Sequence, residues 1–305
     1  MFEPAEPISA RTRFCAVFGH PIRHSASPAM HNAAIAALGL DWRYLAFEVR
    51  PEQLSQAIAG AMAMKFVGLN LTVPHKLLAM DMVDVLDASA RAWGAVNTIR
   101  FEAEDGSGHW RPISELDEIP GRVRSHGFNT DADALVQALS EDLKVKLAGA
   151  TVLLLGAGGA GRTAALKIAS ERVSKLFLVN RTRSKVEAVA AEIKRLWPEV
   201  PVVLGYPDKP VDLVINATSV GLKPEDALPL DPGAFSITKT SAVYDMIYRP
   251  AETLLLRQAR EAGARVANGL GMLLFQGARA FEIWSGRAAP LPVMRRALER
   301  NVYGN

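Results

Sequence analysis

The chain has 305 residues, 49% of them hydrophobic, which is enough for two medium-sized domains with cores of their own. Its 35 basic and 32 acidic side chains are mixed along the chain, and this balance favours neither nucleic acid nor a membrane as a partner. Cys15 is the only cysteine, which excludes an internal disulfide and an all-cysteine metal site. The N-terminus has no apolar export signal, and no run approaches about 20 apolar residues, so we expect a soluble, cytoplasmic protein.

The first third of the chain alternates short apolar runs with helical periods. Strands are predicted at 13–20, 42–49 and 66–73, and helices at 27–40, 51–64 and 76–87. Ser27 stands at the expected N-cap of the first helix and Pro28 at its first position. Regular alternation of this kind predicts a mostly parallel sheet covered on both faces. Residues 102–127 carry charges, glycines and prolines, and we expect them to form a long surface loop.

A helix beginning near Asp131 leads into a second α/β region. Its strands are predicted at 151–155, 175–180, 200–205, 211–218, 241–248 and 264–269. The C-terminal segments are helical without strands of their own, so we expect them to return to the first domain. The predicted fold is therefore α/β with two domains. These are a mostly parallel substrate domain of residues 1–130 plus 268–305 and a Rossmann dinucleotide-binding domain of residues 131–267.

A glycine-rich turn opens the second domain. The turn "GAGGAG" comprises Gly156, Ala157, Gly158, Gly159, Ala160 and Gly161. In this spacing the first glycine permits a tight turn, the second lets backbone approach a pyrophosphate, and the last allows a strand and a helix to pack closely. The turn follows an apolar strand and precedes a helix, so its backbone N–H groups would face the phosphates. This context predicts a dinucleotide site, the alternative being a turn with only a packing role.

The end of the next strand indicates which dinucleotide is bound. An NAD site usually has a carboxylate here, about 20 residues after the glycines, to accept hydrogen bonds from the ribose. This chain instead has Asn180, Arg181, Thr182 and Arg183. Arginine binds phosphate through paired charge-assisted hydrogen bonds, so the segment favours the 2′-phosphate of NADP over NAD. The alternative is a solvated turn with a helix beginning at Ser184.

Polar side chains follow the predicted strands of the first domain, where open α/β sheets bind ligands. These candidates are Ser25 and Ser27 after the first strand, Thr72 and Lys76 after the third, Asn97, and Asp131 at the domain junction. Structural alternatives stay open for them. Either serine could cap a helix, Lys76 could be solvated, and Asp131 could be an N-cap.

Taken together, the motifs of the chain resemble the shikimate dehydrogenase family over most of its length. The matching stretches, in the family's order, are "GHPIRHSASP", "NLTVPHK", "GAVNT", "FNTD", "GAGGAG", "INATSVGL", "YDMIYRPAETLLL" and "NGLGMLLFQGARAFEIWSG". The resemblance implies NADP-linked, reversible reduction of 3-dehydroshikimate to shikimate, by a protein that binds this small molecule as a monomer or homodimer and needs no metal.

The resemblance also implies roles for individual residues. Lys76 and Asp131 would form the catalytic pair, in which a lysine ammonium can stabilise the growing negative charge and donate the proton. The substrate carboxylate would contact Ser25, Ser27 and Tyr248, and the ring hydroxyls would contact Thr72, Asn97 and Gln276. Beyond the glycine turn and residues 180–183, the cofactor site would include Thr218, Gly269 and Met272.

Two features depart from the family's usual pattern. Residues 102–127 are longer than the short hairpin common at this position, and Ala134 stands where a glycine often follows the "NTD" motif. Both put the substrate's identity in doubt, and quinate, with one more hydroxyl, is the nearest alternative. A non-catalytic sensor of shikimate or cofactor is a further alternative, but the presence of both Lys76 and Asp131 favours an enzyme.

Overall fold

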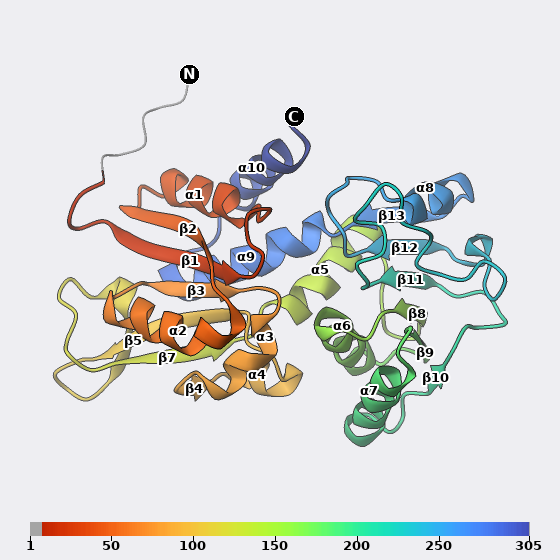
Figure 1. Cartoon of the computed structure of the whole chain (residues 1–305), viewed down its shortest axis with the longest axis horizontal. Helices are drawn as coiled ribbons and strands as arrows, with labels where there is room; N and C mark the ends of the chain where they lie inside the picture. Colours follow the sequence, from red (N-terminus) through yellow and green to blue (C-terminus); the bar gives the residue numbers. More distant parts are fainter. Residues whose placement is uncertain (1–7, 305) are drawn as a thin grey trace. The chain divides into compact units, whose positions relative to one another are not determined.

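The structure is a computed structural model that describes residues 8–304, and it contains two compact α/β units (Figure 1). Unit 1 comprises Met1–Thr130 and Leu274–Asn305, and unit 2 comprises Asp131–Leu273. The prediction of two α/β domains, with the C-terminal helices belonging to the first, is confirmed. Predictions that concern residues 1–7 and residue 305 lie outside the described part of the chain.

The sheet of unit 1 is mixed. Its strands are β1 (Arg13–Gly19), β2 (Trp42–Glu48), β3 (Gly68–Leu71), β4 (Val85–Leu86), β5 (Thr98–Glu104), β6 (Trp110–Pro112) and β7 (Val123–Phe128). They lie in the order β2-β1-β3-β5-β7-β4, with β6 beside β5. Strand β1 is parallel to β2 and β3, and β4 is parallel to β7, whereas β5 is antiparallel to β3, β6 and β7.

The expectation of a long loop at residues 102–127 is wrong, because this range contains the end of β5, all of β6 and all but the last residue of β7. The charges that suggested a loop alternate along the strands and pair with one another across them. Glu102 is buried opposite Arg124, and its carboxylate also contacts Arg100 and His126. A charge-rich segment can therefore form sheet when its charges meet on one face.

The predicted helix at 76–87 is also shorter than expected. Helix α3 (His75–Leu78) and the 3₁₀ turn η2 (Ala79–Asp81) are followed by β4. Asp84 explains the change of direction, because its Oδ2 accepts hydrogen bonds from the Ser125 backbone N and Oγ, each at 2.7 Å. These bonds tie the segment to β7 instead of letting the helix continue.

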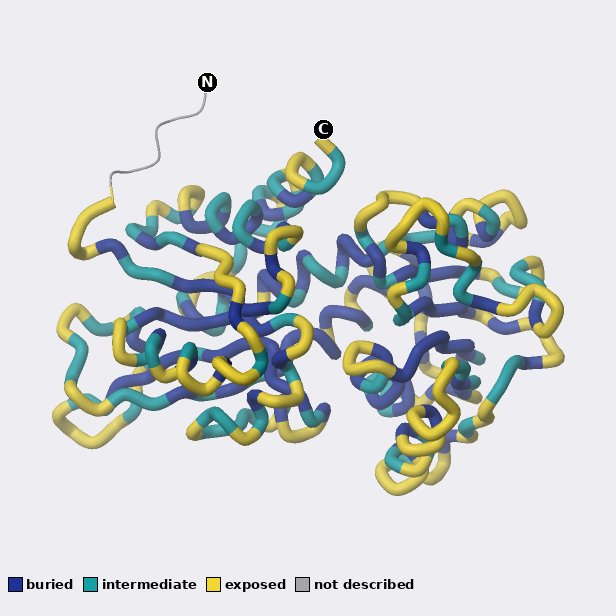
Figure 2. The backbone as a smooth tube through the Cα atoms, in the orientation of Figure 1, coloured by how far each residue is buried: buried dark blue, intermediate teal, exposed yellow. Residues whose placement is uncertain are grey.

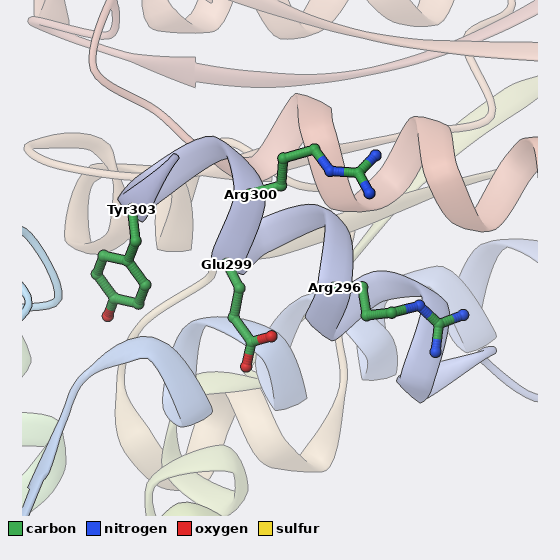
Figure 3. Close-up of a pocket in the computed structure, with 4 residues that line it drawn as sticks. All are labelled: Arg296, Glu299, Arg300 and Tyr303. Atoms are coloured by element: carbon green, nitrogen blue, oxygen red, sulfur yellow. The ribbon is translucent and has the colours of Figure 1, made fainter. Parts of the chain in front are cut away.

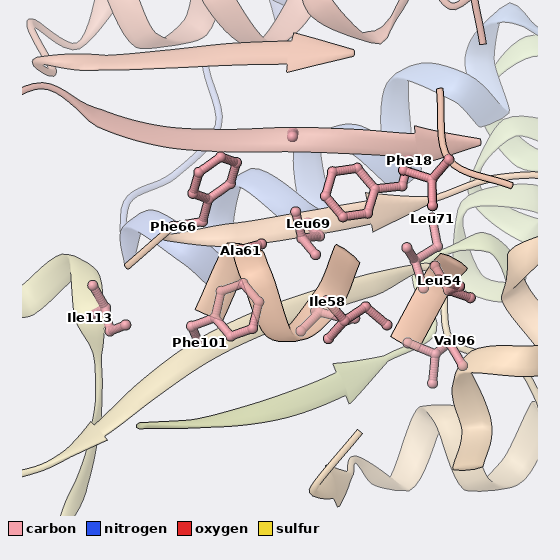
Figure 4. Packing of buried hydrophobic residues seen from close by; sticks show 14 of the residues in the cluster. Phe18, Leu54, Ile58, Ala61, Phe66, Leu69, Leu71, Val96, Phe101 and Ile113 are labelled. Carbon is pink, nitrogen blue, oxygen red and sulfur yellow. The ribbon is translucent and has the colours of Figure 1, made fainter. Parts of the chain in front are cut away.

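Helices cover both faces of this sheet. Helix α2 (Leu54–Ala63) buries Leu54 and Ile58 against Phe18, Leu69 and other apolar side chains of the strands (Figure 4). The opposite face carries α1 (Ser27–Ala37), the unit 1 part of α9 (Leu270–Ser285) and α10 (Leu291–Tyr303), while α4 (Ala88–Trp93) lies beside β4 and β7. The 3₁₀ turns η1 (Pro51–Gln53) and η3 (Ile113–Glu115) complete the unit.

A close contact fixes α9 on the sheet. The fully buried Trp284 donates its Nε1 to the Ile99 carbonyl at 2.9 Å. A Cβ at Gly68 would lie 2.2 Å from this nitrogen, so only glycine allows the approach.

The sheet of unit 2 is entirely parallel. Its strands are β8 (Thr151–Leu155), β9 (Lys175–Val179), β10 (Val202–Leu204), β11 (Leu213–Asn216), β12 (Ala242–Asp245) and β13 (Arg265–Asn268). They lie in the order β10-β9-β8-β11-β12-β13, the strand order of a Rossmann fold. The helices are α5 (Asp131–Leu143), α6 (Gly159–Ser170), α7 (Arg183–Leu196) and α8 (Leu254–Glu261), with the 3₁₀ turn η4 (Ile237–Lys239). The central strands are buried, and the exposed segments are mostly loops and outer helix faces (Figure 2).

Candidate functional site

The glycine turn of unit 2 has the geometry that phosphate binding requires. Gly156 has φ +105°, and a Cβ there would lie 2.9 Å from the Ala217 carbonyl carbon. A Cβ at Gly161 would lie 2.3 Å from the Gly156 oxygen, which explains the close strand and helix packing. At Gly158 and Gly159, by contrast, a Cβ would meet no atom within 4 Å. Because α6 begins at Gly159, open space lies at a helix N-terminus, and the turn fits a pyrophosphate.

The segment after β9 is tied to the glycine turn. Asn180 Oδ1 accepts a hydrogen bond from the Ala157 N at 3.1 Å, and its Nδ2 donates to the Thr182 carbonyl at 2.9 Å. Arg181 and Arg183 are exposed, and Arg183 contacts Glu187 at 2.8 Å across two largely exposed side chains. Such a pair is weak. Both guanidinium groups are therefore available to an anion at this end of the turn.

A cavity of about 220 Å³ adjoins the same segment. It is lined by Leu178, Val179, Asn180, Arg183, Val186, Leu204, Gly205 and Tyr206. The lining combines apolar surface from β9 and β10 with an aromatic ring and a guanidinium group. This mixture suits the adenosine end of a dinucleotide, with the guanidinium group at the ribose phosphate.

The remaining expected cofactor residues lie on the other half of the same sheet. Thr218 donates its N and its Oγ1 to Asn216 Oδ1 at 3.0 and 2.7 Å. Gly269 lies against the Met246 backbone, where a Cβ would be 2.1 Å from the carbonyl oxygen. Met272 donates its N to the Tyr244 hydroxyl at 3.3 Å. These three residues follow β11 and β13, at the carboxyl edge of the sheet where parallel folds bind ligands.

In unit 1, the two serines lie at the start of α1. The prediction that Ser27 is the N-cap is wrong, because the cap residue is Ala26 and no side chain caps the helix. Ser27 is the first helical residue and donates its N to Ser25 Oγ at 3.4 Å. Nearby Tyr44 is fully buried, which raises the pKa of its phenol, while the Ser27 side chain opposes that shift.

Thr72 follows β3, beside the end of β1. It donates its N to the Phe18 carbonyl at 3.0 Å, and its Cγ2 would lie 2.4 Å from a Cβ at Gly19. A side chain at Gly19 would displace the threonine, so the glycine makes room for it.

Lys76 lies in the short turn that follows. Its neighbour His75 is buried and donates Nε2 to the Val49 carbonyl at 2.8 Å, while the Lys76 carbonyl accepts the Val96 N at 2.8 Å. The backbone on both sides of the lysine is fixed, and its side chain is half-buried. A fixed turn with a half-buried lysine suits a proton donor.

Asn97 reaches the same edge because β5 is antiparallel to β3, and the Asn97 carbonyl accepts the Leu71 N at 2.9 Å. Its side chain is 2% exposed and bonds to Thr130 through both ends of the amide. Further buried hydrogen bonds link the neighbouring side chains. Asn70 Nδ2 donates to Thr98 Oγ1 at 3.0 Å, and Asn70 Oδ1 accepts from the Tyr44 hydroxyl at 2.8 Å. Unit 1 thus brings Ser25, Ser27, Thr72, Lys76 and Asn97 to the ends of neighbouring strands.

Three predicted residues stand elsewhere in the fold. Gln276 is a half-buried residue of α9 in unit 1. Tyr248 follows β12 in unit 2, where burial raises the pKa of its phenol although Arg249 opposes the shift. Asp131 is 7% exposed and is the first residue of α5, at the start of unit 2. Lys76 belongs to unit 1, so the catalytic pairing of the two remains a prediction.

Sequence reasoning missed a set of buried polar residues beneath these loops. Asn70, Asn216 and Asp245 are each at most 5% exposed and hydrogen-bond to neighbouring segments. The available signal was a polar residue within or at the end of an otherwise apolar strand, because such a residue needs a buried partner.

Other surface features contain no expected site residue. A hollow of about 390 Å³ is lined by Arg296, Glu299, Arg300 and Tyr303, all from α10 (Figure 3).

Among residues 8–304, no three His, Cys, Asp or Glu side chains are arranged to hold a metal ion. Within the same range, every helix is too short or too polar to cross a bilayer.

Three family models match the chain in order. They describe the shikimate dehydrogenase substrate binding domain (residues 17–99), shikimate / quinate 5-dehydrogenase (138–220) and the shikimate 5′-dehydrogenase C-terminal domain (269–299). The shikimate dehydrogenase (NADP⁺) of Methanopyrus kandleri is 39% identical over 298 residues, which cover 95% of this chain and 96% of that protein.

Solved structures agree with this assignment. A shikimate dehydrogenase in complex with NADP⁺ is 36% identical with a TM-score of 0.82, covering 97% of this chain and 98% of its own. A ligand-free 5-ketofructose reductase of a Gluconobacter strain is 33% identical with a TM-score of 0.79, covering 96% and 99%. The match over nearly the whole length, with the strand-end motifs in place, shows that the chain belongs to the shikimate dehydrogenase family.

Proposed function

We propose that the protein is an NADP-dependent shikimate dehydrogenase that interconverts 3-dehydroshikimate and shikimate. The observation that carries this proposal is the 39% identity, over nearly full length, to a relative named for this activity. We further propose that the substrate domain comprises residues 1–130 plus 268–305 and the cofactor domain residues 131–267. A cytoplasmic location and a monomeric or dimeric state complete the proposal, and light scattering after size exclusion tests the latter.

The residues of unit 2 fit NADP. The glycine turn offers backbone N–H groups and open space to the pyrophosphate, and Arg181, Thr182 and Arg183 would hold the 2′-phosphate. Val179 ends β9, and Asn180 follows it. Neither residue carries the carboxylate that an NAD site uses, and this disfavours NAD. When bound, NADP supplies or accepts the hydride.

The side chains of unit 1 would hold the substrate and move the proton. Ser25 and Ser27, with Tyr248 from unit 2, would bind the carboxylate, and Thr72, Asn97 and Gln276 would bind ring hydroxyls. As the ketone is reduced, negative charge develops on its oxygen, and the Lys76 ammonium would stabilise that charge and donate the proton. Asp131 would orient Lys76 and accept a hydrogen bond from the neighbouring hydroxyl.

Quinate is the second candidate substrate, because one matching family model is named for both shikimate and quinate. The 5-ketofructose reductase at 33% identity is a reason to test 5-ketofructose as well. The sensor alternative is disfavoured, since the chain retains both Lys76 and Asp131.

One spectrophotometric experiment tests the proposal. Oxidation of shikimate and of quinate is followed at 340 nm, each with NADP and with NAD, and reduction of 5-ketofructose is followed with NADPH. We expect the largest kcat/KM for shikimate with NADP. A larger kcat/KM for quinate or 5-ketofructose would reassign the substrate. Tight binding of shikimate without turnover would support a sensor.

A further inference from the structure

Asp245 is a buried carboxylate in unit 2. It is the last residue of β12 and is 0% exposed. Its Oδ1 accepts hydrogen bonds from Asn216 Nδ2 and the Ile247 N, both at 3.0 Å, and its Oδ2 accepts one from Thr253 Oγ1 at 2.7 Å. All three partners are donors, so the ionised, acceptor-only form of Asp245 matches its surroundings.

The bond to Asn216 connects Asp245 with the loop after β11. The other side of the Asn216 amide holds Thr218, whose N and Oγ1 both donate to Asn216 Oδ1. Asn216 Nδ2 also donates to the Val220 carbonyl at 3.1 Å, and Thr218 Oγ1 accepts the Val220 N at 3.1 Å. The position of Thr218, an expected cofactor residue, therefore depends on an amide whose orientation Asp245 fixes.

The bond to Ile247 connects Asp245 with the segment that carries Tyr248. Ile247 directly precedes this tyrosine, and its carbonyl accepts the N of Gly269 at 3.1 Å. Thr253 adds a second constraint, because its Oγ1 also caps α8 by accepting the Leu256 N at 3.3 Å. One carboxylate thus bonds to the backbone just before an expected substrate residue and to the helix that follows it.

We propose that Asp245 is a positioning residue that fixes the Thr218 loop and the Tyr248 segment relative to each other. A single buried side chain would then support both cofactor and substrate binding. The inference rests on the proposed function for the identity of the two ligands. A buried carboxylate is unfavourable unless it is hydrogen-bonded. Here the donors that engage it come from the two loops themselves.

The test replaces Asp245 and measures two ligands separately. Asp245→Ala is expected to weaken NADPH binding, measured by fluorescence titration without substrate, and to raise the shikimate KM, each about tenfold or more. Asp245→Asn keeps an acceptor for Asn216 and Ile247, so both constants are expected to stay within about threefold of the wild-type values. Rescue by the amide would show that geometry, and not charge, carries the effect.

The control is Asp212→Ala. Asp212 is an exposed carboxylate of the same unit that accepts the Thr151 N at 2.7 Å beside the amino ends of β8 and β11, and we expect both constants to be unchanged in this variant. If Asp245→Ala does not fold, Asn216→Ala takes its place. It removes the bond to the Thr218 loop but leaves the Ile247 bond, so NADPH binding should weaken more than the shikimate KM rises.

A folded Asp245→Ala variant with both constants within twofold of wild type would overturn the inference. In Asn216→Ala, equal changes in the two constants would overturn it as well. Because NADPH binding is measured without turnover, a wild-type protein that binds NADPH but does not oxidise shikimate would refute only the proposed function. The NADPH titrations of the variants would then still decide the role of Asp245.

Discussion

The side chain of Asn97 bonds to Thr130 at both ends of its amide. Its Nδ2 donates to Thr130 Oγ1 at 2.9 Å, and its Oδ1 accepts the Thr130 N at 2.8 Å. Thr130 immediately precedes Asp131, so this amide fixes the backbone that leads to a proposed catalytic residue. Asn97 Oδ1 also accepts hydrogen bonds from the Thr130 and Thr98 hydroxyls at 3.3 and 3.4 Å, so the second N–H of the amide is the group that can serve a substrate hydroxyl.

Replacing Asn97 should therefore affect both stability and substrate binding. Asn97→Ala leaves the buried Thr130 N without its acceptor, and we expect the free energy of unfolding to fall by about 1–3 kcal/mol and the shikimate KM to rise about tenfold. Thr130→Val is the matched control, because it removes one hydroxyl partner but keeps the Asn97 amide for the substrate. A KM that rises equally in both variants would assign Asn97 a structural role alone.

Lys76 should affect turnover far more than binding. Lys76→Met removes the proton donor while retaining the aliphatic length, and we expect kcat to fall by about 10²–10⁴ with the NADPH dissociation constant unchanged. Lys76→Arg keeps the charge but releases a proton reluctantly, so it should keep substrate affinity without restoring kcat. Unchanged kcat in Lys76→Met would remove this lysine from the mechanism.

The exposed arginines after β9 should determine the choice of cofactor. We expect Arg181→Ala/Arg183→Ala to weaken NADPH binding about 10- to 100-fold, since two charge-assisted contacts with the 2′-phosphate are lost. NADH lacks this phosphate, so its dissociation constant should change little. Arg195→Ala, in the last turn of α7, controls for the loss of positive charge on the same helix. Equal losses for NADPH and NADH would refute the phosphate contact.

Local patterns predicted those parts of the fold that local physics determines. The Gly156 turn and the Arg181 segment follow from backbone freedom and charge within a few residues, and the strand ends carrying Thr72 and Lys76 follow from apolar runs. The pairing of β5 with β7 could not be predicted in this way, because Glu102 becomes a strand residue only when Arg124 lies opposite it. The support of Thr218 by Asp245 likewise depends on β11 and β12 being neighbours, which their sequence separation does not reveal.

Glu102 should stabilise unit 1 in a pH-dependent manner. Burial alone would raise the pKa of this carboxyl, but hydrogen bonds from His126, Arg100 and Arg124 outweigh it and lower the pKa to about 2. Its stabilising contribution is therefore complete at pH values above its unfolded-state pKa of 4.5, and it is lost as the pH falls toward 2. We expect Glu102→Gln to reduce stability by roughly 2–3 kcal/mol at pH 7.

The stability gap between Glu102→Gln and wild type should then narrow below pH 4.5, as the wild-type carboxylate loses its advantage. Denaturant unfolding of both proteins between pH 3 and pH 8 measures this gap. Glu104→Gln is the control, because Glu104 pairs with Arg122, which is 75% exposed, and such pairs contribute about 0–1 kcal/mol. A gap that does not vary with pH would contradict the assigned network.

Asp245 should show the opposite pH dependence. Burial raises the pKa of its carboxyl to about 6, although hydrogen bonds from Ile247, Thr253 and Asn216 partly oppose the shift. Because the folded-state pKa exceeds the unfolded value near 3.8, the folded state binds the proton more tightly, and stability falls as the pH rises from about 4 through 6. The ionised carboxylate thus lowers the stability of unit 2 by up to about 3 kcal/mol above pH 6.

Asp245→Asn removes this charge while preserving the shape of the side chain. Its thermal midpoint relative to wild type should therefore rise between pH 4.5 and pH 8, with Thr253 accepting a hydrogen bond where it formerly donated one. The exposed control Asp212→Asn should show no such rise. A midpoint difference that stays constant with pH would mean that the buried carboxylate is not disfavoured. If the rise occurs, Asp245 lowers the stability of the folded protein at neutral pH. Such a loss of stability is expected of a residue that is kept for the geometry of a binding site.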